Sequence, residues 1–294
     1  MKKYFVCSDI HGFYKVWRRD LRKAGYDKNN EEHILIVLGD IFDRGTEPYQ
    51  IYKFLKSIPV ERLILVKGNH EYLLLDLVKR KMPFNHDYQN GTYDTLISLH
   101  KNPDHERLMW LERNKEKYVD PAVLYYKGRQ VYWKVYKNLF DNKKLNEIVD
   151  WLKSPVWRDY YELGKYIFVH SFIPLFTTFD VNQNKEITKY IPNWRHDSTK
   201  QMWEDATWCC PYEQYIKGYF DKELQNGKVL VCGHWHTSDF FNKLIYPNEP
   251  DKWLDINFGN PIFISKKYPG LIAIDTCTVL TKRVNVLIIS ENEL

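Results

Sequence analysis

The 294-residue sequence contains no apolar run that approaches the ~20 residues a membrane-spanning helix needs. Its first residues, MKKYFVCSDIHG, include two lysines but only a strand-length apolar run and no small-residue cleavage site, so a secretory signal is not expected. Cysteine is scarce: the five cysteines form an odd set without CxxC spacing, which indicates neither a disulfide framework nor a zinc knuckle. We therefore expect a cytoplasmic protein with reduced thiols and no membrane partner.

The sequence also lacks internal repeats, low-complexity tracts and Gly/Ser-rich linkers. Because 44% of the residues are hydrophobic, the chain can bury a sizeable core, and a single domain over residues 1–294 is expected. The net charge of +5 suits a phosphate-bearing substrate, but the clustered Lys/Arg runs of dedicated nucleic-acid binders are missing. Specific binding of duplex nucleic acid is therefore not predicted, and nothing in the composition sets an oligomeric state.

Strand and helix patterns alternate over the first seventy residues. Apolar, β-rich runs at Lys3–Ser8, His33–Leu38 and Arg62–Val66 alternate with helical patterns at Tyr14–Ala24 and Glu47–Ser57. Such βαβ units predict a sheet covered by helices on its faces.

The middle of the chain, residues 72–165, differs in pattern. Helical periodicity at Tyr72–Lys81, His105–Lys117 and Leu145–Lys153 is interrupted by prolines. We expect this segment to form a helical cap inserted into the domain.

Strand patterns return in the second half and supply another sheet. They lie at Tyr166–His170, Val229–Cys232, Ile262–Ser265, Leu271–Asp275 and Arg283–Ile289, and the last two are expected to pair as a hairpin or meander. The predicted fold is thus α/β, with two packed mixed β-sheets flanked by helices and the helical cap as an insertion.

Polar clusters directly follow the first three predicted strands: SDIHG, GDIFDRG and GNHE. Because ligands of open α/β sheets bind outside the carboxyl ends of the strands, these clusters should converge in space. Asp9 and His11 alternate just past a strand, so both side chains can face one metal ion. Asp40 follows Gly39 and can bridge two cations, and Asn69 with His70 follows the third strand.

Histidines follow two later strands as well: His170 ends YIFVHS, and His234 and His236 lie in CGHWHT. A histidine at a strand end is more often a hydrogen-bonded structural group, and an aspartate after a strand more often caps a turn or helix. Five such clusters in order, each after an apolar strand, nevertheless favour one metal site. Carboxylate, imidazole and amide ligands together suit Mn, Fe, Zn or Co pairs better than calcium.

In this order, SDIHG, GDIFDRG, GNHE, VHS and GHWH resemble the signature of the calcineurin-like metallophosphoesterase superfamily. The DRG and GNHE forms are similar to the PPP-type serine/threonine phosphatases of the phage and bacterial branch, which includes symmetrical dinucleoside tetraphosphatases. A softer resemblance extends to YQNGTYDTL, DWLKSPVWRDYYELGKYIFVHS and LIAIDTCTV. The resemblance implies hydrolysis of phosphate esters by a hydroxide that bridges two divalent cations, with Mn first and Fe, Zn, Co, Ni or Mg as alternatives.

The resemblance also implies a role for each motif residue. The first metal would be held by Asp9, His11, Asp40 and His236, and the second by Asp40, Asn69, His170 and His234. His70 would be the general acid, Asp43 its orienting partner, and Arg44 the clamp on the phosphate. Arg44, Asn69 and His70 would contact the substrate.

One expected residue has no counterpart. The branch tends to carry a second phosphate-binding arginine in a Trp-x-Arg context, whereas TWCCPY places Cys209 or Cys210 there, with Arg195 as a candidate substitute. Without that arginine a dianionic monoester loses a charge-assisted contact of ~1.5–3 kcal/mol. Diesters or bulkier substrates then become more plausible. The two cysteines are expected to be buried or loop thiols rather than nucleophiles.

The leading prediction is a phosphomonoesterase similar to a protein serine/threonine phosphatase, acting on a phosphoprotein, a nucleotide or a small phosphoester. Alternatives are a dinucleoside polyphosphate hydrolase, a nucleotide or RNA-end phosphatase with 2′,3′-cyclic phosphodiesterase activity, and a catalytically silent scaffold. Two roles stay open: the aromatic segment Tyr118–Tyr136 either stacks nucleobases or forms a half-buried strand, and Asp275 either touches substrate or caps a loop.

Overall fold

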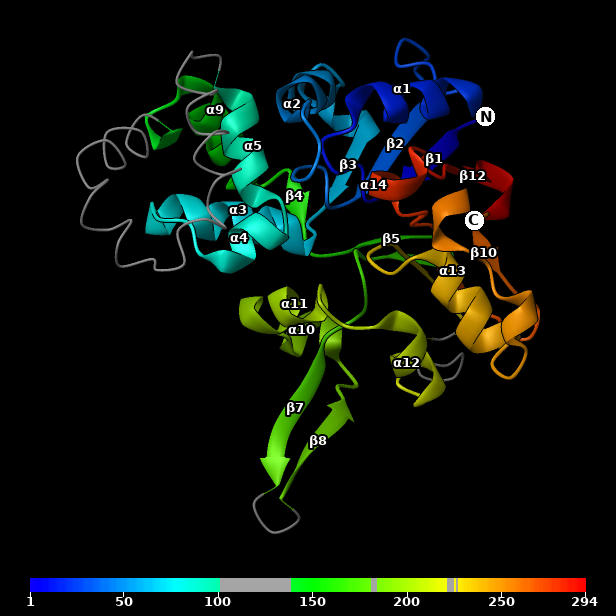
Figure 1. Ribbon diagram of the computed structural model, residues 1–294. Coiled ribbons are helices and arrows are strands. Elements are labelled where there is room, and N and C mark those ends of the chain that lie inside the picture. The colour runs from blue at the N-terminus through cyan, green and yellow to red at the C-terminus, as the bar shows by residue number, and fades with distance from the viewer. Residues whose placement is uncertain (101–138, 181–183, 221–224, 226) are drawn as a thin grey trace.

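The computed structural model describes residues 1–100, 139–180, 184–220, 225 and 227–294, and two five-stranded sheets form its centre (Figure 1). The first sheet has the order β12-β1-β2-β3-β4. Its strands are β1 (Lys3–Cys7), β2 (His33–Leu38), β3 (Leu63–Val66), β4 (Trp157–Arg158) and β12 (Leu287–Ser290). β1 to β4 pair in parallel and β12 pairs antiparallel with β1, so the sheet is mixed, as predicted.

The second sheet has the order β10-β11-β9-β6-β5 and is also mixed. Its strands are β5 (Tyr161–Leu163), β6 (Tyr166–Phe168), β9 (Val229–Cys232), β10 (Phe263–Ile264) and β11 (Leu271–Ala273). β6, β9 and β11 are parallel, and the two edge strands run antiparallel to their neighbours. Apolar side chains of both sheets, such as Val6 and Ile36 from the first and Phe168 and Val231 from the second, share one buried cluster. The predicted packing of two mixed sheets is therefore confirmed.

Helices cover the outer faces of the two sheets. α1 (Tyr14–Lys23) and α2 (Pro48–Lys56) bury one stripe each in the core of the first sheet, and Pro48 suits the first turn because its missing N–H would have no partner there. On the second sheet, α10 (Trp194–Asp197), α11 (Lys200–Ala206), α12 (Pro211–Ile216) and α13 (Thr237–Phe240) pack with a separate aromatic cluster.

The segment expected to form a helical cap contains α3 (Asn69–Arg80), α4 (Asn85–Gln89), α5 (Thr92–Leu99) and α9 (Lys143–Leu152), which gather at one side of the first sheet (Figure 1). Its last residues differ from the expectation, because β4 and β5 add strands to the two sheets. The helix predicted at His105–Lys117 and the aromatic segment Tyr118–Tyr136 lie outside the described residues. Within the described residues, no helix has the length and apolarity to span a membrane.

Residues 175–180 and 185–190 form a feature that the sequence did not predict. Strands β7 (Leu175–Asp180) and β8 (Lys185–Tyr190) pair as a separate antiparallel hairpin that projects from the body of the molecule (Figure 1). Threonine, isoleucine and aromatic residues favour strands, but they do not show which sheet a strand joins.

The predicted pairing of the last two strands is wrong. β11 joins β9 in the second sheet, whereas β12 joins β1 in the first. Between them the chain turns through Cys277, whose φ is 57°, into the short helix α14 (Thr278–Thr281). An apolar pattern marks a strand but not its partner, and here β12 takes the edge of the first sheet beside β1 while β11 lies in the facing second sheet.

Candidate metal centre

The predicted site residues from loops of both sheets come together. Asp9 and His11 follow β1, Asp40 follows β2, Asn69 and His70 open α3 after β3, His170 follows β6, and His234 follows β9. Most of these side chains are nearly fully buried; Asp9, Asp40, His70 and His170 are each 1% exposed. The convergence expected from the strand ends is therefore present.

The backbone at this convergence is strained. Asp9, His11, Asp40, Asp43 and His234 have φ between 48° and 70°, a left-handed region that residues other than glycine seldom adopt. Each such residue costs free energy, and clusters of them are typical of functional sites, where the surrounding structure holds them.

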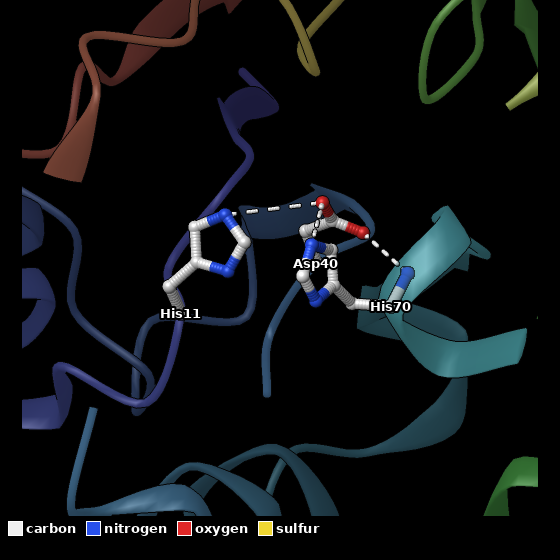
Figure 2. Close-up of side chains that lie close together, drawn as sticks. All are labelled: His11, Asp40 and His70. Carbon is white, nitrogen blue, oxygen red and sulfur yellow. Dashed lines mark hydrogen bonds and ion pairs between the residues drawn. The ribbon is translucent and has the colours of Figure 1, made fainter. Parts of the chain in front are cut away.

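Asp40 forms one group with His11 and His70, whose ligand atoms all lie within 4.8 Å of one another (Figure 2). Nε2 of His11 and Nε2 of His70 each lie 3.8 Å from Oδ2 of Asp40, and the backbone N–H of His70 donates to Oδ1 at 3.0 Å. Nδ1 of His11 lies 3.1 Å from the carbonyl oxygen of Phe42, which places the proton there and leaves Nε2 as the acceptor that faces the group. Oδ1 of Asp9 lies 3.9 Å from that same Nε2.

Asp40 forms a second group with His170 and His234. Nδ1 of His170 donates to the carbonyl oxygen of Leu38 at 2.6 Å, so its Nε2 faces the site as an acceptor. That atom lies 2.9 Å from Oδ1 of Asn69, 3.3 Å from Nδ1 of His234 and 3.5 Å from Oδ1 of Asp40. One carboxylate is therefore shared by two clusters of nitrogen and oxygen ligands.

Glycines leave room for these carboxylates. A Cβ on Gly68 would lie 2.2 Å from Oδ1 of Asp40, and a Cβ on Gly233 would lie 2.3 Å from Oδ2 of Asp9. Both distances are far inside van der Waals contact, so the two loops approach the ligands closely only because these positions have no side chain.

The buried carboxylates and imidazoles of the site have shifted pKa values that indicate too little positive charge around them. Burial raises the pKa of Asp9 to about 6, and the nearby Asp40 carboxylate adds to that rise. Burial likewise raises the pKa of Asp275 well above its usual value. Burial lowers the pKa of His234 to about 3, with His170 adding to the fall. Buried carboxylates beside neutral imidazoles are the donor set that a divalent cation satisfies, so these residues fit the metal that the sequence implied.

Asp43 and Arg44 adjoin the first group through His70. Oδ2 of Asp43 lies 2.6 Å from Nδ1 of His70. Burial alone would lower the pKa of His70, but the carboxylates of Asp40 and Asp43 raise it to about 9. The guanidinium of Arg44 reaches both rings, with Nη1 3.2 Å from Nε2 of His11 and Nη2 3.3 Å from Nε2 of His70. The structure thus gathers a proton carrier and a planar cation at the edge of the ligand groups.

His236 is a predicted ligand that belongs to neither group. Its Nδ1 is 3.7 Å from Oδ2 of Asp239 and its Nε2 is 3.8 Å from Oδ2 of Asp275. Asp275 is buried and accepts the N–H of Cys277 at 2.7 Å. Asp275 therefore holds its loop, which is one of the two roles left open by the sequence, and also faces His236.

Arg195 does not substitute for the missing second arginine among the site residues. Its Nε bonds to the carboxylate of Glu162, which Lys228 also contacts, and its guanidinium lies 4.1 Å from the centre of the Trp194 ring. This ion-paired group joins β5 to α10 and the start of β9. Arg195 is therefore occupied in structural contacts.

The TWCC segment brings an indole to the site instead of a cation. The ring centroid of Trp208 lies 6.1 Å from that of His234, and the residue is 47% exposed. Burial raises the pKa of Cys209 and of Cys210 to about 11, which disfavours the thiolate that a nucleophile needs. This agrees with the prediction of structural thiols.

Three buried polar residues that sequence analysis did not single out hold the site together. Glu71 accepts the N–H groups of Asp40, Ile41 and Gly68 at 2.8, 3.0 and 2.8 Å. Thr92 and Thr95 contact Asp43. Glu71 is the last residue of GNHE and the threonines lie in YQNGTYDTL, so both motifs were visible. The contacts were not, because they depend on how α3 and α5 pack.

The two-sheet fold and the shared-carboxylate site define a metallophosphoesterase-like protein. A family model described as "Calcineurin-like phosphoesterase" matches residues 2–238, and the chain belongs to that family. The predicted membership of the calcineurin-like superfamily is thereby confirmed.

Among individual proteins, the chain is similar to the symmetrical bis(5′-nucleosyl)-tetraphosphatase of Buchnera aphidicola, with 30% identity over 38% of this chain and 37% of that protein. It is similar to the protein of the same name from Coxiella burnetii, with 28% identity over 51% of this chain and 49% of that protein. The matches thus span about half or less of these relatives. The chain also resembles a solved structure of a cold-active protein tyrosine phosphatase. The match covers 99% of this chain and 75% of that protein, with 16% identity and a TM-score of 0.50, and it supports the fold alone.

Proposed function

We propose that the protein hydrolyses phosphate esters with the help of two divalent cations. The observation that carries this proposal is that Asp40 belongs to two ligand groups, one with His11 and His70 and one with His170 and the half-buried His234. Asp9, His11 and Asp40 would hold one cation, with His236 as a further proposed ligand, and Asp40, Asn69, His170 and His234 would hold the other. When bound, such a pair polarises the phosphoryl oxygens and lowers the pKa of a water. Manganese is the proposed metal, because imidazole and carboxylate ligands suit it.

The chain's own residues supply binding and proton transfer. Arg44 reaches both histidines of the first group, so its planar fork is placed to donate to two phosphate oxygens. His70 would give a proton from Nε2 to the departing ester oxygen, while Asp43 holds Nδ1 at 2.6 Å and stabilises the imidazolium. The raised pKa of about 9 favours a proton on this ring at neutral pH.

Turnover of p-nitrophenyl phosphate by metal-stripped protein, before and after addition of Mn²⁺, tests the proposal. Activity should depend on the metal and fall at least ~100-fold in Asp40→Asn, since this change weakens both ligand groups at once. Asp251→Asn, an exposed aspartate in a short 3₁₀ helix, is the matched control and should keep full activity. Equal activity in Asp40→Asn and the wild type would contradict the proposal.

A second candidate function is hydrolysis of dinucleoside polyphosphates, and the exposed indole of Trp208 favours it over the phosphoprotein and cyclic-nucleotide alternatives. An aromatic face beside His234 can stack a nucleobase whose phosphate reaches the ligand groups. The names of the similar tetraphosphatases point the same way.

Profiling of substrates separates these functions. With diadenosine tetraphosphate, Trp208→Ala should lower kcat/KM by ~5–100-fold, because stacking is worth ~1–3 kcal/mol per base. Hydrolysis of glycerol phosphate, which has no ring, should not change. Trp253→Ala removes another exposed tryptophan, 43% accessible, as the control. A preference for phosphopeptides with no effect of Trp208→Ala would instead support the serine/threonine phosphatase alternative.

A further inference from the structure

The first turn of α5 forms hydrogen bonds with Asp43, which lies in the loop after β2. Oγ1 of Thr92 donates to Oδ2 of Asp43 and Oγ1 of Thr95 donates to Oδ1, both at 2.8 Å. The backbone N–H of Asp43 lies 2.8 Å from Oγ1 of Thr95 and donates to it. All three residues are 0% exposed, so no water competes for these bonds. Each carboxylate oxygen of Asp43 is therefore fixed by its own hydroxyl.

These bonds decide which way Asp43 faces. The terminal torsion of an aspartate is broad, so an unrestrained carboxylate would rotate. Here Oδ2 of Asp43 accepts a hydrogen bond from the hydroxyl of Thr92 and another from Nδ1 of His70, the latter at 2.6 Å. With both oxygens occupied, the carboxylate plane is set, and with it the direction in which the His70 ring points.

The same helix also fixes the backbone of Arg44. The N–H of Arg44 donates to the carbonyl oxygen of Gly91 at 3.3 Å, and a Cβ on Gly91 would lie 2.6 Å from that nitrogen. Asp43 and Arg44 have φ of 70° and 65°, which costs free energy in the absence of a partner. Contact with the start of α5 therefore stabilises the left-handed backbone conformation of Asp43 and Arg44.

We propose that Thr92 and Thr95 are positioning residues that aim the Asp43–His70 pair at the departing ester oxygen. This inference rests on the proposed function above. It places control of proton delivery in α5, a helix that supplies none of the ligand groups.

The dependence on the leaving group tests this role. p-Nitrophenolate departs without a proton, whereas the alkoxide of glycerol needs one. A wrongly oriented His70 should therefore slow the hydrolysis of glycerol phosphate but not that of p-nitrophenyl phosphate. Thr92→Val and Thr95→Val keep the shape but remove the hydroxyl. They should lower kcat for glycerol phosphate by ~10–100-fold and change kcat for p-nitrophenyl phosphate by less than ~3-fold, given the ~10²–10⁴-fold typical of general acid catalysis. Thr92→Ser and Thr95→Ser keep the hydroxyl and should restore most of the activity.

A spectroscopic readout does not need turnover. The proton on Nδ1 of His70 lies in a 2.6 Å bond and should give a downfield proton NMR resonance in the wild type. The resonance should weaken or move in the valine variants and return in the serine variants. Ser98→Ala is the matched control, because it removes a hydroxyl of the same helix that donates to the carbonyl oxygen of Thr95 and not to Asp43.

The outcomes separate the inference from the proposed function. If the wild type hydrolyses both esters but the valine variants lose both equally, or lose neither, only the positioning role is overturned. If the wild type hydrolyses neither ester with Mn²⁺, the proposed function fails and the inference falls with it. If a valine variant folds poorly, Thr92→Ala carries the same test, because Thr95 and its bond to the backbone of Asp43 stay in place.

Discussion

The ligand atoms of this site approach one another because several residues adopt left-handed backbone conformations beside glycines. Asp40 is the central case: its φ is 52°, its carboxylate lies between two histidine groups, and Gly68 passes directly against it. A side chain at position 68 would occupy the space that the carboxylate fills. The geometry of the site therefore depends on the absence of a Cβ atom at position 68.

This dependence gives a prediction for Gly68→Ala. The new Cβ would lie 2.2 Å from Oδ1 and 2.7 Å from the backbone nitrogen of Asp40, so Asp40 must move. Affinity for Mn²⁺ should fall by ~10–100-fold, as for other changes that displace a ligand without replacing it. Isothermal titration calorimetry on metal-stripped protein measures this.

Gly218→Ala is the control for that substitution. Nothing lies within 4 Å of its Cβ position, but its φ is 79°, so it should lose about 1 kcal/mol of stability and no metal affinity. Unchanged affinity for Mn²⁺ in Gly68→Ala would contradict this prediction, because it would show that the loop after β3 can shift to accommodate the methyl group without displacing Asp40.

Single residues also mark how far the sequence could predict the site. Asp9, His11, Asp40, His170 and His234 each follow an apolar strand, and that pattern was enough to predict their convergence. His236 has the same signal and faces Asp239 and Asp275, and its role as a ligand stays a prediction. Two positions along a turn can point either way, and only the packed loop decides between them.

At the scale of elements, the first turn of α3 connects two strand-end loops. Glu71 takes the N–H groups that follow β2 and the N–H of Gly68 after β3, and it is 0% exposed. Three backbone donors share one carboxylate, so the loops after β2 and β3 are held in one arrangement.

Glu71→Gln should destabilise the protein by ~1–3 kcal/mol, since the amide offers one oxygen and turns an N–H₂ group toward buried donors. Urea unfolding followed by fluorescence measures the free energy of unfolding. Glu204→Gln, on the partly exposed face of α11, is the matched control and should change it by less than ~0.5 kcal/mol. A neutral result for Glu71→Gln would mean that water or a shifted loop satisfies the freed N–H groups.

Elements differ in how well the sequence predicts them. β1, β2 and β3 are continuous apolar runs between turn signals and were located almost to the residue. The partner of β12 could not be read in this way, because pairing is set by which edge is open after the sheets have packed. The β7-β8 hairpin was missed because its strands join neither large sheet.

At the scale of the molecule, the ligand groups join the two sheets. Asp9, His11, Asp40 and Asn69 follow strands of the first sheet, whereas His170 and His234 follow strands of the second. A cation bound to both sets would link the sheets in addition to their shared apolar core. Such a ligand binds the folded chain and not the unfolded one, so its binding free energy adds to stability.

Thermal unfolding should therefore respond to metal. At a free Mn²⁺ concentration 100 times the dissociation constant, stability should rise by ~2.7 kcal/mol, which raises Tm by roughly 5 °C for a chain of this size. His234→Asn should lose much of this shift because it removes one of the two histidine ligands that follow strands of the second sheet. His196→Asn, an exposed histidine on α10, should keep it. A full shift in His234→Asn would show that His234 does not hold the bound cation, and the link between the sheets would then rest on His170 and the apolar core.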